Sequence, residues 1–552
     1  MHLRSSGTRA LRLFATILLF LSVGRTAHAQ FRYPPDDPRL QGHPPLNVAD
    51  FGAVGDGKSD DTAAIQRAVD TAVKGDRKVV FFPPGTYLVS SVRVAPGLTL
   101  ITFSATMKVI PKAGEFNVVF TTFNHRDRAS YFWSSDTDSP PLIIYGFKYD
   151  GNAAEQGEFS NFQLQHQGFV ALAADGSKRG RLLANVFNCE GWDGVGDFVY
   201  VYTNVELEMA YCKATDVFRG MLSIGAGKSI VRGYGLTAEG ERYPTGIDLE
   251  PTAGSGALDV RLSKVRLKGD FDVAVQPGST IQIDDLHSGP PFNLVNRGST
   301  INISNSRFEL GTPDDNNHIR VRESGGTTQF TNCDFFAVRE ESGSASTGPR
   351  YAMRVNWRPT NDSRVIFDGC RFHAGDGATA AVYSEPDQQQ LGNELVLRNC
   401  QIGPDFAYGV LMEQGGNFDI VNTTFNSRTG IYLDHRDTYY YRARMQAIGL
   451  GPEAQHYLRV DHGDPRNTIL HHAVELHDSE NVIWNPGGNV SANRFGGRRV
   501  IRGDNDPTTN KTPGFIGDVY IRLGKDLEER WQCIATDTQQ ARWIPLYSRS
   551  IN

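Results

Sequence analysis

Several features that would narrow the function of a protein are scarce in this chain of 552 residues. Its net charge is −6, and without a basic excess nothing predicts a nucleic-acid-binding protein. Its six cysteines show no Cys and His spacing of the kind that zinc sites use, so no metal site is predicted. The apolar run near the N-terminus, Leu13–Val23, is too short to cross a bilayer comfortably. The composition therefore predicts a globular protein with no membrane span, rich in turns because it holds 57 glycines and 27 prolines.

The first 29 residues have the order of a secretory signal. Arg4, Arg9 and Arg12 precede the apolar run, and the small residues around Ala27–Ala29 then form a cleavage site before Gln30. The alternative is a membrane anchor, which the short run disfavours. We therefore expect a secreted protein, extracellular or periplasmic.

Five of the cysteines share one local context. They stand in "NCEGW", "YCKAT", "TNCDF", "DGCRF" and "RNCQI", at Cys189, Cys212, Cys333, Cys370 and Cys400. A recurring small residue in one context is typical of a repeated buried position, and free Cys is commonly buried. Pairing of Cys189 with Cys212 on neighbouring repeats is the alternative.

A repeat runs from about residue 184 to residue 426. Segments such as "TINISNSRF", "RVIFDGCRF" and "NFDIVNTTF" recur, most often 20 to 23 residues apart and with longer insertions in places. That period indicates a solenoid whose turns vary in length. Leucine-rich repeats need Leu-rich helical returns, whereas these units carry Val, Ile, Thr, Asn and Gly. The pattern favours a parallel β-helix.

One amphipathic helix is predicted near the N-terminus. In "SDDTAAIQRAVDTAV", Ser59, Asp60 or Asp61 would cap its start. Its apolar stripe consists of Ile65, Ala68, Val69, Ala72 and Val73. A helix of this kind would cover the exposed edge of the first coil.

The segment "FGAVGDGKSDDTAAIQ" followed by "VVFFPPGTYLVSS" resembles the entry segment of the pectate lyase superfamily, in its rhamnogalacturonase-, polygalacturonase- and epimerase-like branch. The resemblance implies a right-handed parallel β-helix that acts on polysaccharide, such as pectin. It does not define the reaction, because one fold hosts several chemistries. The "NTD…GDD…GHG…RIK" series of polygalacturonases and the "DPHE" signature of mannuronan epimerases are both absent.

The predicted fold is therefore all-β, a right-handed parallel β-helix with an N-terminal capping helix and a small C-terminal β-module. After the signal, the β-helix spans 30–485, with its cap from about 45. A linker follows over 486–514, and the module covers 515–552. The module is expected to seal the solenoid or to assemble it into a homotrimer.

Each coil holds a strand with alternating residues, such as "GIDLEP" (246–251), which assigns one outward polar face. Aromatic rings and arginine forks on such a face suit a sugar chain. The arginines Arg320, Arg322 and Arg354 would form a ladder along it. The candidate substrate-binding residues are Tyr200, Tyr202, Arg320, Arg322, Arg354, Asn356, Tyr383 and Glu385. The alternative is an ordinary polar outer face with nothing bound.

Stacking of the coils would gather an acid and base set on this face, with neighbouring strands about 4.8 Å apart. The candidate catalytic residues are Asp248, Glu250, Asp197, Arg219 and His166. The structural alternative is an ion-pair ladder with capped turns.

The chemistry stays open at this point. Paired carboxyls suit a hydrolase, whereas a lyase needs a base and a cation for an enolate-like charge, and an epimerase needs similar parts. No cofactor is predicted, and calcium is retained only for the lyase alternative. The competing functions are a non-catalytic, adhesin-like glycan-binding solenoid and a phage-type depolymerase spike.

Overall fold

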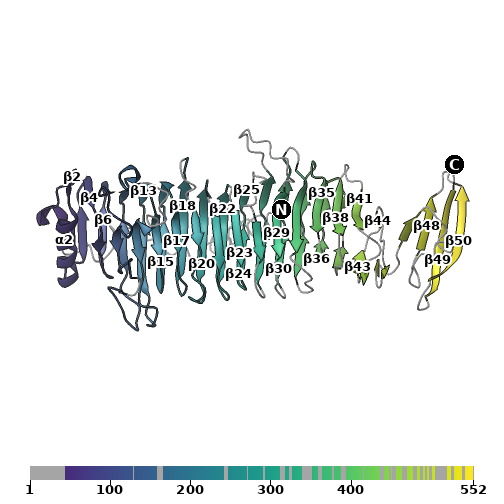
Figure 1. Ribbon diagram of the computed structural model, residues 1–552, viewed down its shortest axis with the longest axis horizontal. Coiled ribbons are helices and arrows are strands. Elements are labelled where there is room, and N and C mark those ends of the chain that lie inside the picture. The colour runs from purple at the N-terminus through teal and green to yellow at the C-terminus, as the bar shows by residue number, and fades with distance from the viewer. Residues whose placement is uncertain are drawn as a thin grey trace, which may run out of the picture.

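The computed structural model describes residues 44–435 except 128–129, 158–165, 242–245, 270, 290–291, 311–317, 322–325, 338–350, 358–362, 376–377, 387–392 and 414–415. Beyond residue 435 it describes the backbone of the strands. The predicted signal segment, 1–29, lies outside the described residues. The fold is the predicted right-handed parallel β-helix, drawn with its long axis horizontal in Figure 1.

Within the described residues, each coil contributes one strand to a 15-stranded sheet, here called sheet B, and the rest to a 29-stranded sheet, here called sheet A. Sheet A folds along a bend, so it consists of two parallel ladders, and β18, β20 and β22 run through both. The solenoid therefore has three faces. Its interior is filled by side chains from all three.

Sheet B carries the face that the sequence pattern singled out. Its strands are β5 (Val92–Arg93), β8 (Val118–Thr121), β11 (Gly168–Leu172), β14 (Asp197–Val201), β17 (Gly220–Ile224), β19 (Ile247–Leu249), β21 (Phe271–Val275), β23 (Phe292–Asn296), β26 (His318–Val321), β29 (Tyr351–Trp357), β32 (Ala380–Pro386), β35 (Tyr408–Glu413), β38 (Thr429–His435), β41 (His456–His462) and β44 (Val482–Trp484).

The ladder of sheet A that follows sheet B in each coil forms the second face. It comprises β1 (Leu46–Asn47), β3 (Val79–Phe82), β6 (Thr99–Thr102), β9 (Leu142–Tyr145), β12 (Leu182–Phe187), β15 (Val205–Ala210), β18 (Ile230–Glu239), β20 (Asp259–Leu267), β22 (Thr280–Ser288), β24 (Thr300–Ser304), β27 (Thr327–Thr331), β30 (Arg364–Asp368), β33 (Glu394–Arg398), β36 (Gly416–Val421), β39 (Tyr441–Gln446), β43 (His472–Leu476) and β46 (Arg494–Phe495).

The other ladder of sheet A completes the coil on the far side of the bend. Besides the shared strands, it comprises β2 (Asp56–Asp60), β4 (Gly85–Val89), β7 (Ala105–Val109), β10 (Lys148–Asp150), β13 (Glu190–Gly194), β16 (Lys213–Val217), β25 (Arg307–Leu310), β28 (Asp334–Ala337), β31 (Arg371–His373), β34 (Gln401–Ile402), β37 (Thr424–Phe425) and β40 (Gly449–Leu450).

The bend between the two ladders is made in the same way in coil after coil. One residue takes a left-handed backbone, and the next residue points inward. The left-handed residues include Asn188, Tyr211, Gly235, Lys264, Asp285, Asn305, Asn332, Gly369, Asn399 and Asn422. Asn, Asp and Gly tolerate this conformation best, which explains why they predominate here.

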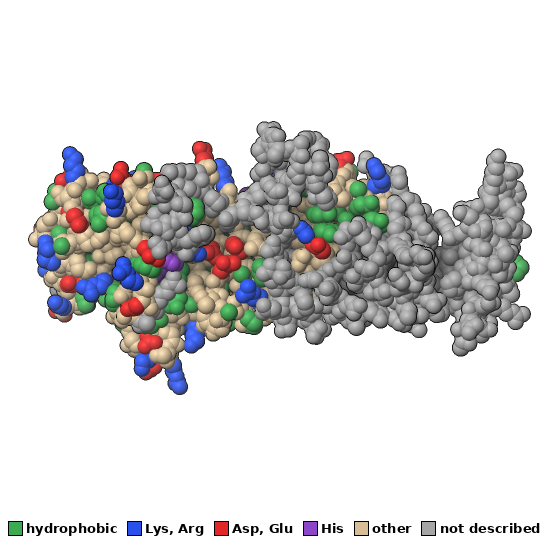
Figure 2. All heavy atoms as spheres, viewed as in Figure 1, with side chains coloured by type: hydrophobic (Ala, Val, Ile, Leu, Met, Phe, Trp, Pro, Cys, Tyr) green, Lys and Arg blue, Asp and Glu red, His purple; other side chains and the backbone are tan. Residues whose placement is uncertain are grey.

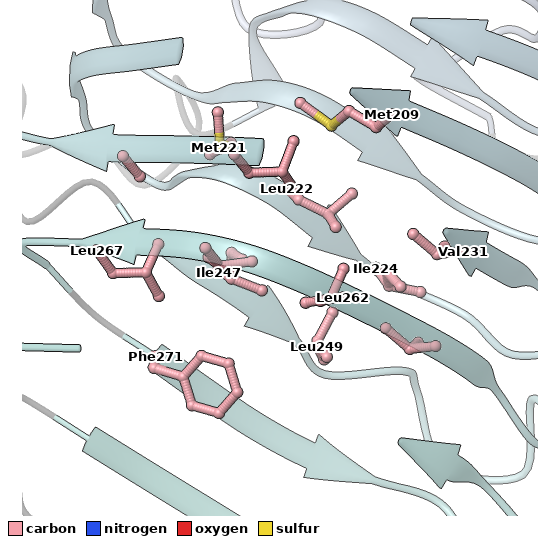
Figure 3. Close-up of a cluster of buried hydrophobic side chains, with 14 of the residues drawn as sticks. Met209, Met221, Leu222, Ile224, Val231, Ile247, Leu249, Leu262, Leu267 and Phe271 are labelled. Carbon is pink, nitrogen blue, oxygen red and sulfur yellow. The ribbon is translucent and has the colours of Figure 1, made fainter. Parts of the chain in front are cut away.

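Five of the six cysteines occupy the inward position that follows the bend. Cys189, Cys212, Cys333, Cys370 and Cys400 are all buried and free, so the predicted repeated inward position is confirmed. Elsewhere the core consists of aliphatic and aromatic side chains. Figure 3 shows such a cluster, with Ile247 and Leu249 of β19 pointing toward Leu222 and Leu262 of neighbouring strands.

The predicted helix is α2 (Thr62–Lys74), which lies at the N-terminal end of the solenoid in Figure 1. Ile65, Ala68, Val69 and Ala72 are buried in the main core, as predicted. Val73 is 42% exposed, so its place in the stripe was wrong, because it lies at the edge of the buried face. A short 3-10 helix, η3 (Val48–Phe51), packs against α2, and a second, η4 (Ala153–Glu155), follows β10. The capping role of α2 stays a prediction.

The start of α2 combines two acidic residues. Asp60 Oδ1 accepts a hydrogen bond from the Thr62 backbone nitrogen at 3.0 Å. Asp61, at the N-cap position, makes no capping bond, because its carboxylate accepts from the backbone nitrogens of Val54 at 2.6 Å and Gly55 at 3.1 Å. Asp60 therefore supplies the cap, and Asp61 secures the glycine-rich turn.

Solenoid strands continue beyond residue 440, where the sequence pattern fades. Strands β39, β43 and β46 extend sheet A, and β42 (Ile469–Leu470) pairs with β45 (Asn489–Val490). A separate four-stranded sheet then forms from β47 (Val500–Gly503), β48 (Val519–Leu523), β49 (Leu527–Thr536) and β50 (Ala541–Ser550). β45, β46 and β47 fall inside the predicted linker, and the domain boundaries stay predictions.

A substitution at the bend tests this description of the coil. We expect Gly369→Ala to lower the free energy of unfolding by about 1–2 kcal/mol, because Ala is strained at the Gly369 φ of +66°. An added Cβ would also lie 2.5 Å from Asn332 Oδ1. Gly369→Asn is the control, since Asn332 and Asn399 hold this position in the adjoining coils. Both variants add this Cβ, so thermal unfolding followed by circular dichroism should rank Asn above Ala through the backbone preference alone, and equal melting would contradict the strain.

Candidate active site

Three consecutive strands of sheet B, β14, β17 and β19, bring together most of the predicted catalytic residues. Arg219 Nη2 donates to Asp248 Oδ2 at 2.9 Å, and Arg219 Nε lies 3.9 Å from Asp197 Oδ1. One guanidinium therefore contacts carboxylates from the strand before its own and from the strand after. Glu250 follows β19 and interacts electrostatically with both Asp248 and Arg219. We call Asp197, Arg219, Asp248 and Glu250 the acidic cluster.

The backbone register agrees with the predicted closeness of Asp197 and Arg219. Asp197 pairs with Gly168 on one side and with Gly220, the residue after Arg219, on the other. Arg219 precedes β17, so its long side chain, rather than its backbone position, makes the contact with Asp197. Figure 2 shows acidic side chains in red gathered beside a histidine in purple on one face of the solenoid.

Asp197 is almost completely buried, although it was predicted on an outward face. It is 2% exposed, and its carboxylate accepts a short hydrogen bond from Ser223 Oγ on β17. Burial raises the pKa of Asp197 to about 7, the Asp248 charge adds to the rise, and Arg219 and Ser223 oppose it. Asp197 can therefore exchange a proton near neutral pH.

Asp248 is the carboxylate that Arg219 contacts most closely. Ile247 and Leu249 on either side are buried, which confirms that Asp248 points outward. Its Oδ1 atom has no hydrogen-bond partner among the described residues, while Oδ2 is held by Arg219. Burial raises the pKa of Asp248, against the opposing effect of Arg219. One oxygen is thus held by Arg219, and the other is buried without a hydrogen bond from the described residues, so a change in its protonation or a ligand's donor would relieve an unpaired polar atom.

Glu250 lies at the solvent-facing end of the same strand. Partial desolvation and the nearby Asp248 charge raise its pKa, and the charges of Arg219 and Arg297 lower it less. Two carboxyls two residues apart on one strand are roughly 6.5 Å apart at Cα. Their environments differ, because Asp248 is tied to Arg219 and Glu250 is open to water.

Asp272 was missed by the sequence analysis. It lies on β21 in register with Asp248, and Asn293 of β23 follows in the same row. Asn293 Nδ2 donates to Asp272 Oδ1 at 2.9 Å. The signal was present, since Asp272 has the same parity as the outward residues Ala274 and Gln276. Continuing the alternation to the first residue of the strand would have found it.

A second missed residue, His125, links the remaining prediction, His166, to the site. The His166 ring stacks on Phe116 at 5.2 Å between centroids and lies 5.4 Å from the His125 ring. His125 in turn lies 5.1 Å from the ring of Tyr200. His166 is therefore connected to the acidic cluster through the rings of His125 and Tyr200. Its predicted position one coil before Asp197 is supported by the pairing of Gly168 with Asp197.

Tyr200 and Tyr202 form one wall of this aromatic group. Tyr200 is only 6% exposed, because it packs with Phe123 in a small second core outside sheet B. Its ring lies over Gly225, where a Cβ would fall 2.1 Å from the Tyr200 hydroxyl. The absence of a side chain at Gly225 thus makes room for Tyr200. Tyr202 stacks on Phe123 at 5.9 Å.

The other predicted substrate-binding residues lie further along sheet B. Arg354 forms an ion pair with Glu385, to which Asn356 Nδ2 also donates at 3.2 Å. Tyr383 stacks on Tyr351 at 4.3 Å. Three strands separate β29 from β19, so this group begins about 19 Å from Asp248 at the spacing of neighbouring strands.

The predicted arginine ladder is not a single row. Arg354 pairs in register with His318, whereas Arg320 pairs with Asn356, so these arginines belong to different rows of sheet B. The side chain of Arg320 and the whole of Arg322 lie outside the described residues. The single row was not found because the turns impose a register that similar strand patterns do not show, and the role of these arginines in binding stays a prediction.

The described part of the chain holds neither a metal-binding cluster nor a membrane-spanning helix. Its His, Cys, Asp and Glu side chains form no group of three or more that could hold a metal ion. Its helices include none with the length and apolar content needed to cross a membrane.

Titration of Asp197 should make stability depend on pH. The folded pKa of about 7 lies above the ordinary 3.8, so the folded protein holds a proton that the unfolded chain releases between these values. This stabilisation is fully present below about pH 4 and is lost as the pH rises to about 7. Relative to Asp197→Asn, wild-type melting temperature should fall across that range and then level off. A constant difference from pH 4 to pH 8 would contradict the buried proton.

Comparison with known proteins supports the resemblance at the N-terminus. Residues 46–135 match the family model described as rhamnogalacturonase A/epimerase, pectate lyase-like. A mannuronan C5-epimerase of Azotobacter vinelandii, AlgE5, is 59% identical over 44 residues, which are 8% of this chain and 4% of that protein. A probable glucan endo-1,3-beta-glucosidase of Arthroderma benhamiae is 42% identical over 80 residues, which are 13% and 9% of the two chains. The match spans less than a tenth of either relative.

Among solved structures, the tailspike protein of Escherichia coli bacteriophage HK620 is similar over 90% of this chain and 84% of its own. Its sequence identity is 11%, and its TM-score is 0.46. The A-module of the Azotobacter vinelandii epimerase AlgE4 covers 77% of this chain and 99% of its own, with 13% identity and a TM-score of 0.30.

Proposed function

We propose that this chain, whose N-terminal segment is that of a pectate lyase-like protein of the rhamnogalacturonase and epimerase group, is a secreted enzyme that cleaves glycosidic bonds in a uronate-containing polysaccharide. The acidic cluster on sheet B is the proposed site of cleavage. Support for a carbohydrate substrate comes from the family match and from relatives named as epimerases and a glucosidase. Secretion rests on the order of residues 1–29.

The single observation that carries this proposal is the sharing of Arg219 by two desolvated carboxyls. Asp197 and Asp248 both have raised pKa values, and both face the same guanidinium. An ion-pair ladder built only for stability gains little from burying its charges. Carboxyls with raised pKa values are the groups that general acid catalysis needs near neutral pH.

The geometry favours hydrolysis over elimination. A lyase needs a cation to stabilise the enolate-like charge that develops at the uronate carboxylate. The charge of Arg219 is already shared between Asp197 and Asp248, and Glu250 adds a third carboxyl. In a hydrolase, a protonated carboxyl assists the leaving group, and a second carboxylate activates water. Asp248 with Glu250, roughly 6.5 Å apart at Cα, would suit such a pair.

A polysaccharide panel tests the proposal. Each substrate is incubated with the full chain, and reducing ends are measured together with the absorbance of unsaturated uronate. We expect new reducing ends without new absorbance. Reducing ends accompanied by absorbance would replace hydrolysis by elimination, and the panel would then be repeated with calcium and with a chelator.

A non-catalytic glycan-binding role is the second candidate, and the tyrosine stacks favour it. Tyr351 with Tyr383, and Tyr408 with Tyr432 at 4.7 Å, present ring pairs along sheet B. Retained binding without any product on the panel would support this role over catalysis. Assembly into a homotrimer through 515–552 remains a separate proposal, tested by the sedimentation of the full chain and of a chain ending at residue 514.

A further inference from the structure

A basic recess lies on the turns that follow the strands of the acidic cluster. Its volume is about 620 Å³, and its lining includes five exposed or partly exposed basic side chains. These residues are Lys178, Arg179, Arg181, Lys228 and Arg261. Asp259 is the single carboxylate in the lining, although the whole chain is net acidic. We call this feature the basic recess.

The turn that carries Lys178, Arg179 and Arg181 is held in place by the buried side chain of Asn204. Asn204 is 4% exposed, and its Nδ2 donates to the backbone oxygens of Asp175, Lys178 and Gly180 at 3.1, 3.4 and 2.8 Å. Lys228, from the next coil, reaches back to the Gly176 oxygen at 2.9 Å. The cations are therefore presented by a fixed turn, which lowers the entropy lost when they bind a ligand.

The carboxylates around the basic recess neutralise only part of its charge. Lys178 lies 3.7 Å from Asp136, and Arg181 lies 3.8 Å from Glu206, both longer than a hydrogen bond. Arg261 lies 3.5 Å from Asp259, which is shared with Arg232 at 3.1 Å.

The remaining two cations have no such partner. Within the part of the chain that the structure describes, no carboxylate oxygen within 4.0 Å pairs with Arg179 or Lys228. The basic recess thus keeps a surplus of positive charge on a concave surface, which attracts anions.

The arrangement fits a linear polyanion better than a small anion. The cations come from successive coils stacked about 4.8 Å apart, so they extend along the solenoid axis. The lining contains no aromatic residue, and single-stranded nucleic acids are usually held by stacking on aromatic rings. Anionic groups carried at intervals along a sugar chain would meet several of these cations at once.

We infer that the basic recess is a second binding site, which holds an anionic polysaccharide on the coils that carry the acidic cluster. This inference takes its ligand class from the proposed function. It also completes that function, because a cluster with three carboxyls and one shared arginine repels a uronate carboxylate. Asn204, Lys228 and Ala257 follow β14, β17 and β19 in the chain, so the same coils carry the acidic cluster and the basic recess. Anion recognition and bond cleavage would then be divided between two faces of one set of coils.

Affinity electrophoresis through gels containing polysaccharide tests the inference. The double variant Arg179→Gln with Arg261→Gln removes two charges but leaves the contacts of Asn204 and Lys228 intact. The matched control is Lys58→Gln with Arg77→Gln, which removes two exposed charges near the N-terminus. We expect the recess variant to lose about tenfold in affinity for polygalacturonate, a 1.4 kcal/mol change, and to become less sensitive to salt.

Gels that contain dextran sulfate identify the anionic group that binds, and gels that contain neutral dextran test whether the uncharged sugar binds. Loss of affinity for dextran sulfate alone would assign the basic recess to sulfate esters, and loss for polygalacturonate alone would assign it to uronates. Either result supports an anionic chain. Equal binding of recess variant and control to both polymers would overturn the inference, as would an equal loss for neutral dextran.

These experiments distinguish failure of the proposed binding site from failure of the proposed cleavage activity. If no substrate is cleaved but the recess variant still loses affinity, the basic recess stands and the proposed enzyme activity falls. If cleavage is found and the recess variant binds as the control does, the activity stands and the basic recess falls. Arg179→Gln alone provides a milder variant if the double variant is produced in poor yield.

Discussion

Asp248→Asn should lower turnover by about a hundredfold or more on a substrate that the wild type cleaves. The substitution keeps the size of the side chain and removes the charge that Arg219 contacts at 2.9 Å. It also makes the Oδ1 position, which has no partner among the described residues, unable to act as an acid or base. The measurement is initial rate against substrate concentration, so that kcat and KM are separated.

The control for this experiment is a carboxylate in a similar ion pair outside the acidic cluster. Asp285 Oδ1 lies 2.8 Å from Arg266 Nη2 on a different face. Asp285 has a left-handed backbone, which Asn also accepts, so Asp285→Asn should leave turnover unchanged. A loss of activity shared by both variants would indicate a general effect of lost ion pairs.

Glu250→Gln completes the test of the pair. If Asp248 and Glu250 act together, the single variants should each lose most of the activity, and the double variant should lose little more. Near wild-type turnover in both single variants would move the chemistry elsewhere. Asp272, in register with Asp248, and His125, beside Tyr200, would then be the next candidates.

Ile247→Asp should destabilise the solenoid by about 3–5 kcal/mol, because it places an unpaired charge in the core. Ile247 is 1% exposed and packs among the aliphatic side chains in Figure 3. Unfolding in denaturant, followed by circular dichroism, gives the free energy of unfolding.

An outward residue provides the comparison for Ile247→Asp. Gln282 is exposed on β22, so Gln282→Asp should change stability by no more than about 0.5 kcal/mol. If the two variants unfolded alike, the alternation of inward and outward residues in these coils would be wrong.

A strand of sheet B such as β19 could be predicted because its apolar and polar residues alternate, whereas β8, β11 and β17 are buried along their whole length and lack that pattern. The contacts of Arg219 with Asp197 and Asp248 followed from stacking alone. The burial of Tyr200 did not, since it depends on the segment around Phe123, which is remote in sequence and returns over sheet B. Local alternation can assign a side chain to the outside of a sheet but cannot tell whether another segment covers it.

Register was the other limit of the sequence analysis. Arg320 and Arg354 stand at the same place in similar strand patterns, yet they fall in different rows. The pairing depends on the length and path of the turns that join successive coils, and these have no simple sequence pattern. The strands β45 and β46, which fall inside the predicted linker, were missed because each is only two residues long and shows no alternation.

The left-handed bend has a consequence for how such a protein can diversify. At the bend of sheet A, coils as far apart as those of Asn188 and Asn422 each use a single left-handed residue, so the bend holds no insertion. The connections on either side of sheet B, by contrast, differ in length from coil to coil. Among the described coils, the differences in length therefore lie along the two edges of the face that carries the acidic cluster. Natural variation can reshape the surroundings of the site without altering the scaffold, and a library for new substrate specificity should draw its diversity from those edges alone.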